Sequence, residues 1–474
     1  MPASIQNGRP RAGSVHRSRA GRLHARGCLL VFVLAAALAG CSDRQAPGTN
    51  APGKQAPRAS VEGRGGMVAS SHPLATDAGV AVLRAGGNAV DAAVAVAFTL
   101  GVVEPWNAGI GGGAFILLRM ADGRSAAIDG REVAPAGASR DMYLDAGGEP
   151  TDDSKTGARA MGVPGTAAAL ALALDVYGTR PPSEILAPAI ALARNGFPIG
   201  ERMARTIARS KKRLGGFEEW SRIYLVGGEA PAPDHVLKQP ELGGSLELLA
   251  RFGTSALYGG SLGSAVVADV RAQGGILSAE DLQRYQPVIR QPLEGSYRGH
   301  TVLAFPPPAG GVVVIELLHL LERFDLSALG AGSAEAVHVM AEAMKLAFAD
   351  RAAYLGDPGA VKVPTAGLVS KAYAARRGAG ISPDRATPVA GGGDPFGAEG
   401  GNTTHFSVVD AAGNAVSVTQ SNNLPFGSGI VAKATGIVLN DEMDDFSAKP
   451  GAPNAYGLVG AEANAIAPGK RPLS

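Results

Sequence analysis

An alternating run led by a threonine, Thr403 to Asp410, constrains the fold of this chain more than any other feature. Its sequence, TTHFSVVD, sets polar and apolar side chains in turn and is rich in β-branched and aromatic residues, as in a strand with one buried face. The stretch ahead of it, from Arg376 to Asn402, is rich in Gly and Pro and carries no helix or strand pattern. Long loops of this kind are usually functional or disordered. We therefore expect a strand that begins at Thr403, directly after a long Gly- and Pro-rich loop.

The peptide bond between Asn402 and Thr403 is a candidate site of backbone cleavage. A threonine hydroxyl is a weak nucleophile unless a base lies beside it. Breaking this bond would create an α-amine on Thr403 with a pKa of about 7.7–8.0, which suits a general base near neutral pH. Thr403 would then carry both nucleophile and base. From spacing alone, a plain strand start fits as well, and Asn402-Thr403-Thr404 also matches a glycosylation acceptor in eukaryotic secretion.

Several long motifs on both sides of this junction resemble the γ-glutamyltranspeptidase family of N-terminal nucleophile hydrolases. After the junction they are TTHFSVVDAAGNAVSVT, FGSGIV, GIVLNDEMDDFSAKPG and KRPLS. Before it they are VASSHPLATDAGVAVLRAGGNAVDAAVAVAFTLGVVEP, GIGGGAF, AIDGREVAPA, GVPGTAAAL, FPPPAGG and ADRAAYLGDP, in the family's order. The resemblance implies that residues 64–402 form a large subunit and that residues 403–474 begin a small subunit, which together make a heterodimer after cleavage.

The periodicity of the chain predicts helices and antiparallel strands in separate runs. Helices are expected over 74–83, 89–100, 312–324 and 335–355, hairpins over 114–120 with 125–129 and over 404–409 with 415–419, and a strand over 437–440. This arrangement indicates an α+β fold with layered packing. The resemblance sharpens it to a four-layer αββα sandwich of the N-terminal nucleophile hydrolase type, with extra helices from the large subunit.

Residues 1–40 have the pattern of a lipoprotein-type signal peptide. Arginines without acidic residues precede an apolar run from Cys28 to Gly40, which is too short to span a bilayer, since spanning takes about 20 residues. The end of this run, LAGC, resembles a bacterial lipobox, so we expect a lipid on Cys41 that anchors a periplasmic protein to a bacterial membrane. An ordinary signal peptide with an incidental cysteine is the alternative. Residues 41–63 are polar and rich in Pro and Gly, as in a flexible tether.

Composition limits the classes of partner and cofactor that the sequence predicts. The chain of 474 residues is 46% hydrophobic and 18% charged, so it can bury a large core. Its net charge of +2 becomes negative once the arginine-rich residues 1–40 are removed, and nothing favours nucleic acid as a partner. The only cysteines, Cys28 and Cys41, predict no disulfide. The eight histidines lack metal-ligand spacing, so neither a metal nor another cofactor is expected.

Three local patterns favour packing over chemistry. GIGGGA at residues 109–114 leads into a strand, whereas dinucleotide binding needs a following helix, so its glycines are expected to allow close backbone approach. Ser261 fits a G-x-S-x-G motif without the strand that a serine hydrolase needs, and we expect it to cap a helix over 265–273. Val337, Met340, Met344 and Phe348 recur at helical spacing, which predicts a core stripe.

The resemblance implies a pocket for small γ-glutamyl compounds such as glutathione. Arg131 would bind the α-carboxylate, since a guanidinium pairs well with a carboxylate. Glu442 and Asp445 would bind the α-ammonium with help from Asn423. Without the resemblance, Arg131 would pass for a surface charge paired with Glu132, and the acidic cluster for a solvated turn.

Three further residues receive roles only by resemblance. Ser421 stands where many family members carry a second threonine that hydrogen-bonds the nucleophile. Ser474 matches the first serine of a pair that, with backbone amides, stabilises the oxyanion. Tyr456, in residues 450–457, matches a lid over the pocket. The second serine of the pair is missing, so we expect a C-terminally incomplete family member.

The function expected from these residues is that of a self-cleaving γ-glutamyltransferase or glutathione hydrolase. It would pass a γ-glutamyl group through a Thr403 ester to water or to an amino acid. A glutaryl-type β-lactam (cephalosporin) acylase of the same fold is the alternative within the family. An inactive lipoprotein remnant with a binding or structural role is the alternative of another class.

Overall fold

The centre of the fold is a six-stranded antiparallel sheet in the order β1-β9-β10-β2-β3-β6. The computed structural model describes residues 61–389 and 403–474, and residues from Gly63 onward form one compact unit. The strands of the sheet are β1 (Gly66–Ala69), β9 (Thr403–Asp410), β10 (Ala415–Ser421), β2 (Gly113–Arg119), β3 (Ser125–Gly130) and β6 (Val288–Arg290).

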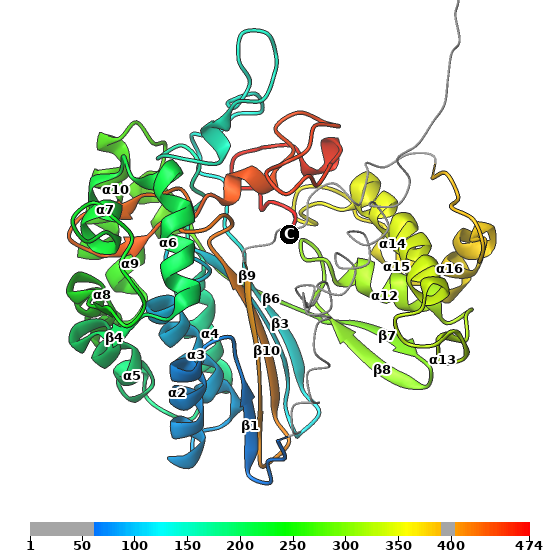
Figure 1. Ribbon diagram of the computed structural model, residues 1–474, viewed down its shortest axis with the longest axis horizontal. Helices are drawn as coiled ribbons and strands as arrows, with labels where there is room; N and C mark the ends of the chain where they lie inside the picture. The colour runs from blue at the N-terminus through cyan, green and yellow to red at the C-terminus, as the bar shows by residue number, and fades with distance from the viewer. Residues whose placement is uncertain (1–60, 390–402) are drawn as a thin grey trace, which may run out of the picture. The chain divides into compact units, whose positions relative to one another are not determined.

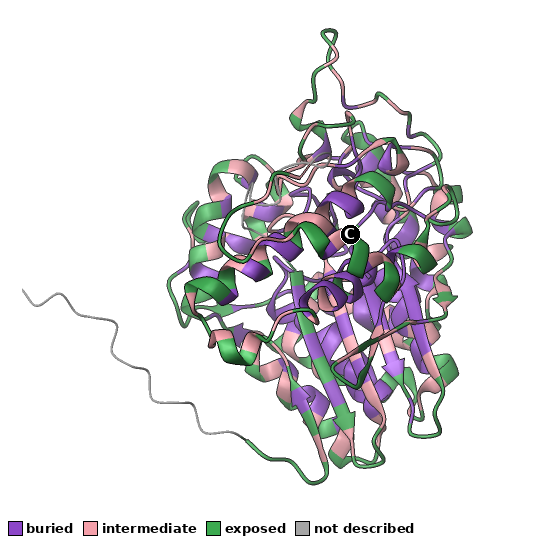
Figure 2. Cartoon of the chain, turned by 90° about the vertical axis from the view of Figure 1, so that its right-hand side faces the viewer, coloured by how far each residue is buried: buried purple, intermediate pink, exposed green. Residues whose placement is uncertain are grey.

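The hairpin formed by β9 and β10 lies inside this sheet. β9 pairs with β1 on one side, and β10 pairs with β2 on the other. Along β9, exposed and buried residues alternate, as Figure 2 shows for the strands of the sheet. The segment after Thr403 is therefore held on both edges by strands that precede the candidate cleavage site.

A helical layer covers the face of the sheet where Phe406, Val408 and Ile116 are buried (Figure 1). It consists of α2 (Pro73–Arg84), α3 (Ala89–Val103) and α4 (Thr166–Tyr177), with α5 (Pro182–Asn195) and α8 (Pro240–Phe252) packed behind α3 and beside each other. Helix α3 is apolar on all sides, as expected for a helix enclosed between the sheet and α5. As predicted, Asn88 caps α3, and its capping box with Asp91 satisfies the first free amides.

Further short elements surround this layer. They are the helices α6 (Glu201–Leu214), α7 (Glu218–Tyr224), α9 (Ser255–Tyr258), α10 (Ser261–Ala272) and α11 (Ala279–Arg284), and the paired strands β4 (Phe197–Pro198) with β5 (Val236–Leu237) and β11 (Val431–Ala432) with β12 (Ile437–Val438). The 3-10 turns are η1 (Asp152–Ser154), η2 (Gly378–Gly380), η3 (Glu442–Asp445) and η4 (Glu462–Asn464).

The opposite face of the sheet meets a second α and β group. This group contains the hairpin of β7 (Leu293–Tyr297) and β8 (His300–Ala304) and the helices α12 (Gly311–Leu321), α13 (Leu326–Leu329), α14 (Ala334–Tyr354), α15 (Thr365–Leu368) and α16 (Lys371–Arg377). Phe115 and Ala127 of the sheet pack against Phe305 and Ala309, and the two phenylalanine rings lie 4.7 Å apart. The layers thus follow the αββα order, with a two-stranded second sheet in the described residues.

The predicted helices and hairpins all form, but two local predictions are wrong. The N-cap of α10 is Gly260, so Ser261 is the first residue of the helix and not its cap. Of the predicted stripe, Val337, Met340 and Met344 are exposed, at 57%, 43% and 37%, and Phe348 alone packs against a core cluster. Helix α14 instead turns Ala336, Val339, Ala343 and Ala347 inward, where small side chains allow α12 to approach closely.

Candidate active site

The glycine run before β2 brings three segments into close contact. An added Cβ would lie 2.1 Å from the Val438 carbonyl oxygen at Gly111 and 2.1 Å from the Ser421 carbonyl oxygen at Gly112. At Gly113 it would lie 2.1 Å from Glu132 Oε2. At Gly111 and Gly112, where the neighbouring atoms belong to the backbone, only glycine fits such spaces. These residues therefore serve close packing around the site, as the sequence suggested.

One cavity of about 260 Å³ gathers the candidate residues from both sides of the cleavage junction. Its lining includes the predicted Arg131, Thr403, Ser421, Asn423, Glu442, Asp445, Tyr456 and Ser474. Asn402 lies outside the described residues. Residues far apart in the sequence thus meet at the ends of β2, β9 and β10.

Thr403 is the first residue of β9 and is exposed at the cavity. Its cross-strand partner is Ser421, the last residue of β10. The Ser421 hydroxyl accepts a hydrogen bond of 2.8 Å from the Asn423 amide. Asn423 has a positive φ of 72°, and its side-chain amide donates to the Asp441 carbonyl oxygen at 3.0 Å. The chain therefore turns sharply after β10 and keeps Asn423 at the cavity wall.

Arg131 is buried, with 4% exposure, so it is not the surface charge that an isolated arginine would suggest. Its Nη1 lies 2.9 Å from Glu442 Oε1, and its Nη2 is paired with Asp445. Its Nε and Nη2 also donate to the carbonyl oxygens of Pro472 and Leu473, at 3.2 and 3.3 Å. Burial alone would lower the pKa of Arg131, but the neighbouring carboxyls outweigh it and raise that pKa, so the guanidinium stays charged.

Glu132 is not the main partner of Arg131. Its carboxyl is fully buried, lies 3.8 Å from Arg131 Nη1, and has no hydrogen-bond partner among the described residues. Burial and the nearby Glu442 raise the pKa of Glu132 well above its ordinary value. Glu442 and Asp445, from the other side of the junction, are the closer ion-pair partners.

The acidic turn η3 is fixed from several sides and is not a solvated turn. Asp444 accepts hydrogen bonds from Ser154 Oγ at 2.7 Å and from the Ala455 amide at 2.8 Å. Asn440, just before the turn, donates to the carbonyl oxygens of Gly111 and Gly162 at 2.8 and 3.0 Å. The carboxyl of Glu442 is only 1% exposed. These contacts hold Glu442 and Asp445 of the turn against Arg131.

Two segments near the end of the chain complete the cavity. The Tyr456 hydroxyl donates to the Asn423 carbonyl oxygen at 2.7 Å, which places the expected lid residue beside Asn423 at the cavity. Ser474 lines the cavity, and its amide donates to the Pro308 carbonyl oxygen at 2.9 Å.

Sequence reasoning missed a hydrogen-bonded chain behind Thr403. Thr404 points to the helical side of β9, and its Oγ1 lies 2.8 Å from Ser71 Oγ. Ser71 in turn donates to Glu104 Oε2 at 2.9 Å, and Asn107 donates to the same oxygen at 3.1 Å. The alternation of β9 was the available signal, because it sets a polar Thr404 where a core side chain belongs and so requires a buried partner.

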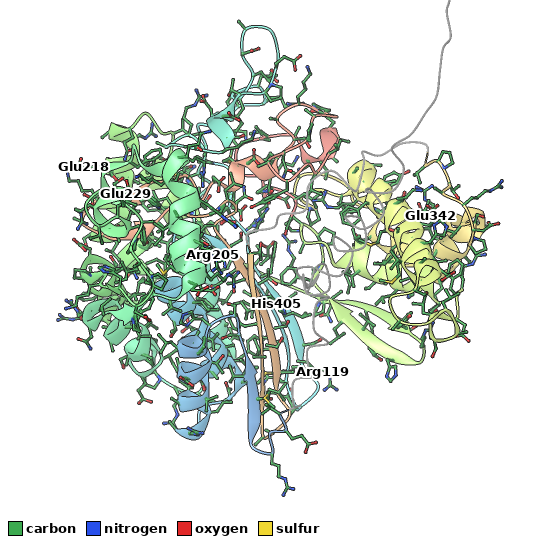
Figure 3. All side chains as sticks on the ribbon, in the orientation of Figure 1. Arg119, Arg205, Glu218, Glu229, Glu342 and His405 are labelled. Carbon is green, nitrogen blue, oxygen red and sulfur yellow. The ribbon has the colours of Figure 1, made fainter. Side chains whose placement is uncertain are left out.

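His405, which Figure 3 labels, lies two residues after Thr403 along β9 and so faces the same side of the sheet. Its Nδ1 lies 2.8 Å from Thr419 Oγ1, and its Nε2 lies 3.1 Å from Ser417 Oγ. Burial lowers the pKa of His405. The two hydroxyls fix the ring on the sheet beside the cavity.

Residues 61–389 and 403–474 contain no group of three or more His, Cys, Asp or Glu side chains arranged to hold a metal ion. No helix within the same ranges combines the length and apolarity needed to cross a membrane.

Comparison with known families accounts for this combination of residues. The Gamma-glutamyltranspeptidase family matches the chain over residues 75–474. The chain belongs to the γ-glutamyltranspeptidase family. It is 46% identical over 421 residues to the glutathione hydrolase proenzyme of Escherichia coli K12, a match that covers 87% of this chain and 72% of the relative.

Acylases are also among the relatives similar to this chain. The acylase ACY 1 proenzyme of Pseudomonas sp. V22 is 42% identical, over 86% of this chain and 73% of the relative. Among solved structures, the Helicobacter pylori γ-glutamyltranspeptidase has a TM-score of 0.68 at 39% identity, covering 70% of this chain and 95% of its own. The cephalosporin acylase from Bacillus halodurans has a TM-score of 0.76 at 31% identity, covering 88% and 76%. The family and fold are therefore established, and the choice between the two activities depends on the site.

Proposed function

We propose that this protein is a γ-glutamyltransferase and glutathione hydrolase that cleaves γ-glutamyl amides. The observation that carries this proposal is the buried group of Arg131 with Glu442 and Asp445 on the cavity wall. The γ-glutamyl group carries a carboxylate and an ammonium on one carbon, so it can exchange partners with this ion-paired group. Its carboxylate takes the place of the acids on Arg131, and its ammonium takes the place of Arg131 on the acids.

A glutaryl group fits this exchange poorly. It brings a carboxylate to Arg131 but no cation to Glu442 and Asp445, and buried charges without partners are costly. This argument favours the γ-glutamyl activity over that of the glutaryl-type β-lactam acylases, although acylases are among the relatives.

Maturation starts from the uncut chain in this proposal. The Thr403 hydroxyl oxygen attacks the carbonyl carbon of Asn402, and the C–N bond breaks as the nitrogen takes up a proton. Water then hydrolyses the resulting ester, which leaves a carboxylate on Asn402 and restores the Thr403 hydroxyl beside a new α-amine. The products are the large subunit, ending at residue 402, and the small subunit, beginning at Thr403.

The mature site then acts through an acyl-enzyme. The α-amine of Thr403 takes the hydroxyl proton while the oxygen attacks the γ-carbonyl carbon of the substrate. The proton passes to the departing amine, and a γ-glutamyl ester remains on Thr403. Water or the amine of an amino acid attacks this ester and releases glutamate or a γ-glutamyl product. Ser421 positions the nucleophile, and Ser474 contributes to stabilising the oxyanion.

Export and anchoring form a separate part of the proposal. Residues 1–40 act as a lipoprotein-type signal, and a lipid on Cys41 holds the protein at a bacterial membrane in the periplasm. Both segments lie outside the described residues, and the support comes from their sequence alone. Labelling cells with a radioactive fatty acid would mark the wild type and leave a Cys41→Ser variant unmarked.

Paired substrates test the activity directly. We expect kcat/KM for a γ-glutamyl anilide to exceed that for the matching glutaryl anilide by about a hundredfold or more, because the site loses a charged partner with the second. Asp445→Asn, which removes one acid and keeps the shape, should narrow this ratio. A preference for the glutaryl anilide in the wild type would support the acylase instead, and no processing of the expressed protein would support an inactive remnant.

A further inference from the structure

Residues 453–459 form a tight turn, here called the lid turn, that contributes two side chains to the cavity. Pro453 and Val459 pair across its base, and the Asn454 amide donates to the Leu458 carbonyl oxygen at 3.0 Å. Gly457 closes the turn with a φ of 74°, a conformation that favours glycine. Tyr456 and Leu458 both line the cavity.

A single side chain inside the lid turn organises it. Asn454 Oδ1 accepts hydrogen bonds from the amides of Tyr456 and Leu458, each at 3.0 Å. The same side chain donates through Nδ2 to Asp445 Oδ1 at 3.0 Å. The amide orientation follows from this pattern, because two N–H donors require the oxygen and a carboxylate requires the nitrogen.

Asp445 therefore links the lid turn to the charged group in the cavity. One of its carboxylate oxygens is bound by Asn454, and the other is paired with Arg131. With Asn454 on one oxygen, the plane of the carboxylate is fixed, and the second oxygen is directed into the site. Moving the lid turn away would break the bond to Asp445 and release that orientation.

We propose that Asn454 is a positioning residue that couples recognition of the substrate's α-ammonium to closure of the lid turn. This inference depends on the proposed function, because it assigns the ammonium to Asp445. Such coupling is reciprocal: an ammonium bound to Asp445 stabilises the closed turn, and the closed turn strengthens the binding of the ammonium. A ligand without an ammonium does not benefit from it.

Residue 454 needs the side-chain amide of asparagine, which both accepts and donates hydrogen bonds. An aspartate at residue 454 keeps the acceptor for the two amides but sets a second negative charge against Asp445. An alanine loses all three hydrogen bonds. Asn454→Asp thus tests the link to Asp445 with the turn retained, and Asn454→Ala tests the turn and the link together.

The experiment compares two ligands that differ only in the α-ammonium, L-glutamate and glutarate, as competitive inhibitors of the mature enzyme. For Asn454→Asp we expect the inhibition constant of L-glutamate to rise about tenfold, in keeping with the loss of one charge-assisted hydrogen bond. The constant for glutarate should change less than twofold. Asn454→Ala should raise the constant for L-glutamate at least as much.

Lys449→Gln is the control close to the same turn. It removes the surface ion pair with Glu149, at 2.8 Å, and leaves every bond of Asn454 in place, so the ratio of the two inhibition constants should stay at the wild-type value. Processing into two subunits reports that each variant folds. Equal weakening of both ligands in Asn454→Asp, or no weakening of L-glutamate, would overturn the coupling. A wild type that does not prefer L-glutamate over glutarate would instead overturn the proposed function.

Discussion

At the scale of single residues, the site depends on one hydroxyl and on a few charges brought together around it. Thr403 has the chemistry to be both nucleophile and base only after its own backbone bond is cut. The sequence predicted this role, as well as the roles of Arg131, Glu442 and Asp445, because each lies in a recognisable motif. It did not predict that Arg131 would be buried against those same acids, since burial depends on segments distant in the sequence.

Substitution of the nucleophile tests the residue-level mechanism. Thr403→Ala has no hydroxyl, so we expect one uncut polypeptide on a denaturing gel and no hydrolysis of a γ-glutamyl anilide. Thr403→Ser keeps the hydroxyl, and we expect it to be cut, although more slowly, because serine lacks the methyl group that restricts the side-chain rotamer. Two bands from Thr403→Ala, or a small fragment from the wild type that begins anywhere other than Thr403, would contradict the mechanism.

At the scale of elements, helices α12, α14 and α16 are joined by a buried acidic pair. Glu316 of α12 is 1% exposed, and as a carboxylate it has no donor among the described residues. Asp350 of α14 accepts from the Tyr373 hydroxyl at 2.8 Å and from Arg377 Nη2 at 3.1 Å. Burial, together with the neighbouring carboxylate of Asp350, raises the pKa of Glu316 to about 9. The folded protein therefore holds a proton here that the unfolded chain releases at neutral pH.

This pair makes stability depend on pH in a defined direction. The pKa of Glu316 is raised on folding, so the stability that its bound proton contributes is fully present below its ordinary pKa of 4.5. That stability is lost as the pH rises toward 9. Glu316→Gln supplies a neutral donor of the same shape. We expect it to raise the free energy of unfolding at pH 8 by about 1–3 kcal/mol and to change it little at pH 4.5, as measured by urea denaturation.

Asp350→Asn is the matched comparison for this pair. It weakens the contacts with Tyr373 and Arg377, so we expect lower stability at pH 8. If Glu316→Gln raised the free energy of unfolding equally at both pH values, the cause would be better packing and not the proton bound to Glu316.

At the scale of the whole molecule, the two sides of the junction form one sheet. β9 and β10, from after Thr403, lie between β1 and β2, from before it. The proposed cleavage after residue 402 would break one covalent bond and would leave the hydrogen bonds along both flanking strand pairs in place. The site itself contains residues from both sides, such as Arg131 and Glu442.

The cut protein should consequently behave as a single particle. We expect both fragments to elute together from size-exclusion chromatography in native buffer and to separate only in concentrated guanidinium chloride, because separation requires opening the central sheet. Fragments that part in native buffer would contradict this arrangement. The Thr403→Ala variant, as the uncut reference, should elute at the same volume.

The amino-acid sequence by itself determined the local elements of the fold. Alternation predicted the hairpin of β9 and β10, and Asn88 marked the start of α3. These features are local, so a short window of sequence contains the forces that produce them. The role of Thr403 as a self-cleaving nucleophile stays a prediction, which came from motifs spread along the chain that resemble one family. Tertiary structure decided the rest, because burial and ion pairing depend on which distant segments meet. Only the fold turned the methionine stripe of α14 outward, enclosed Arg131 among acids, and set Asn454 against Asp445.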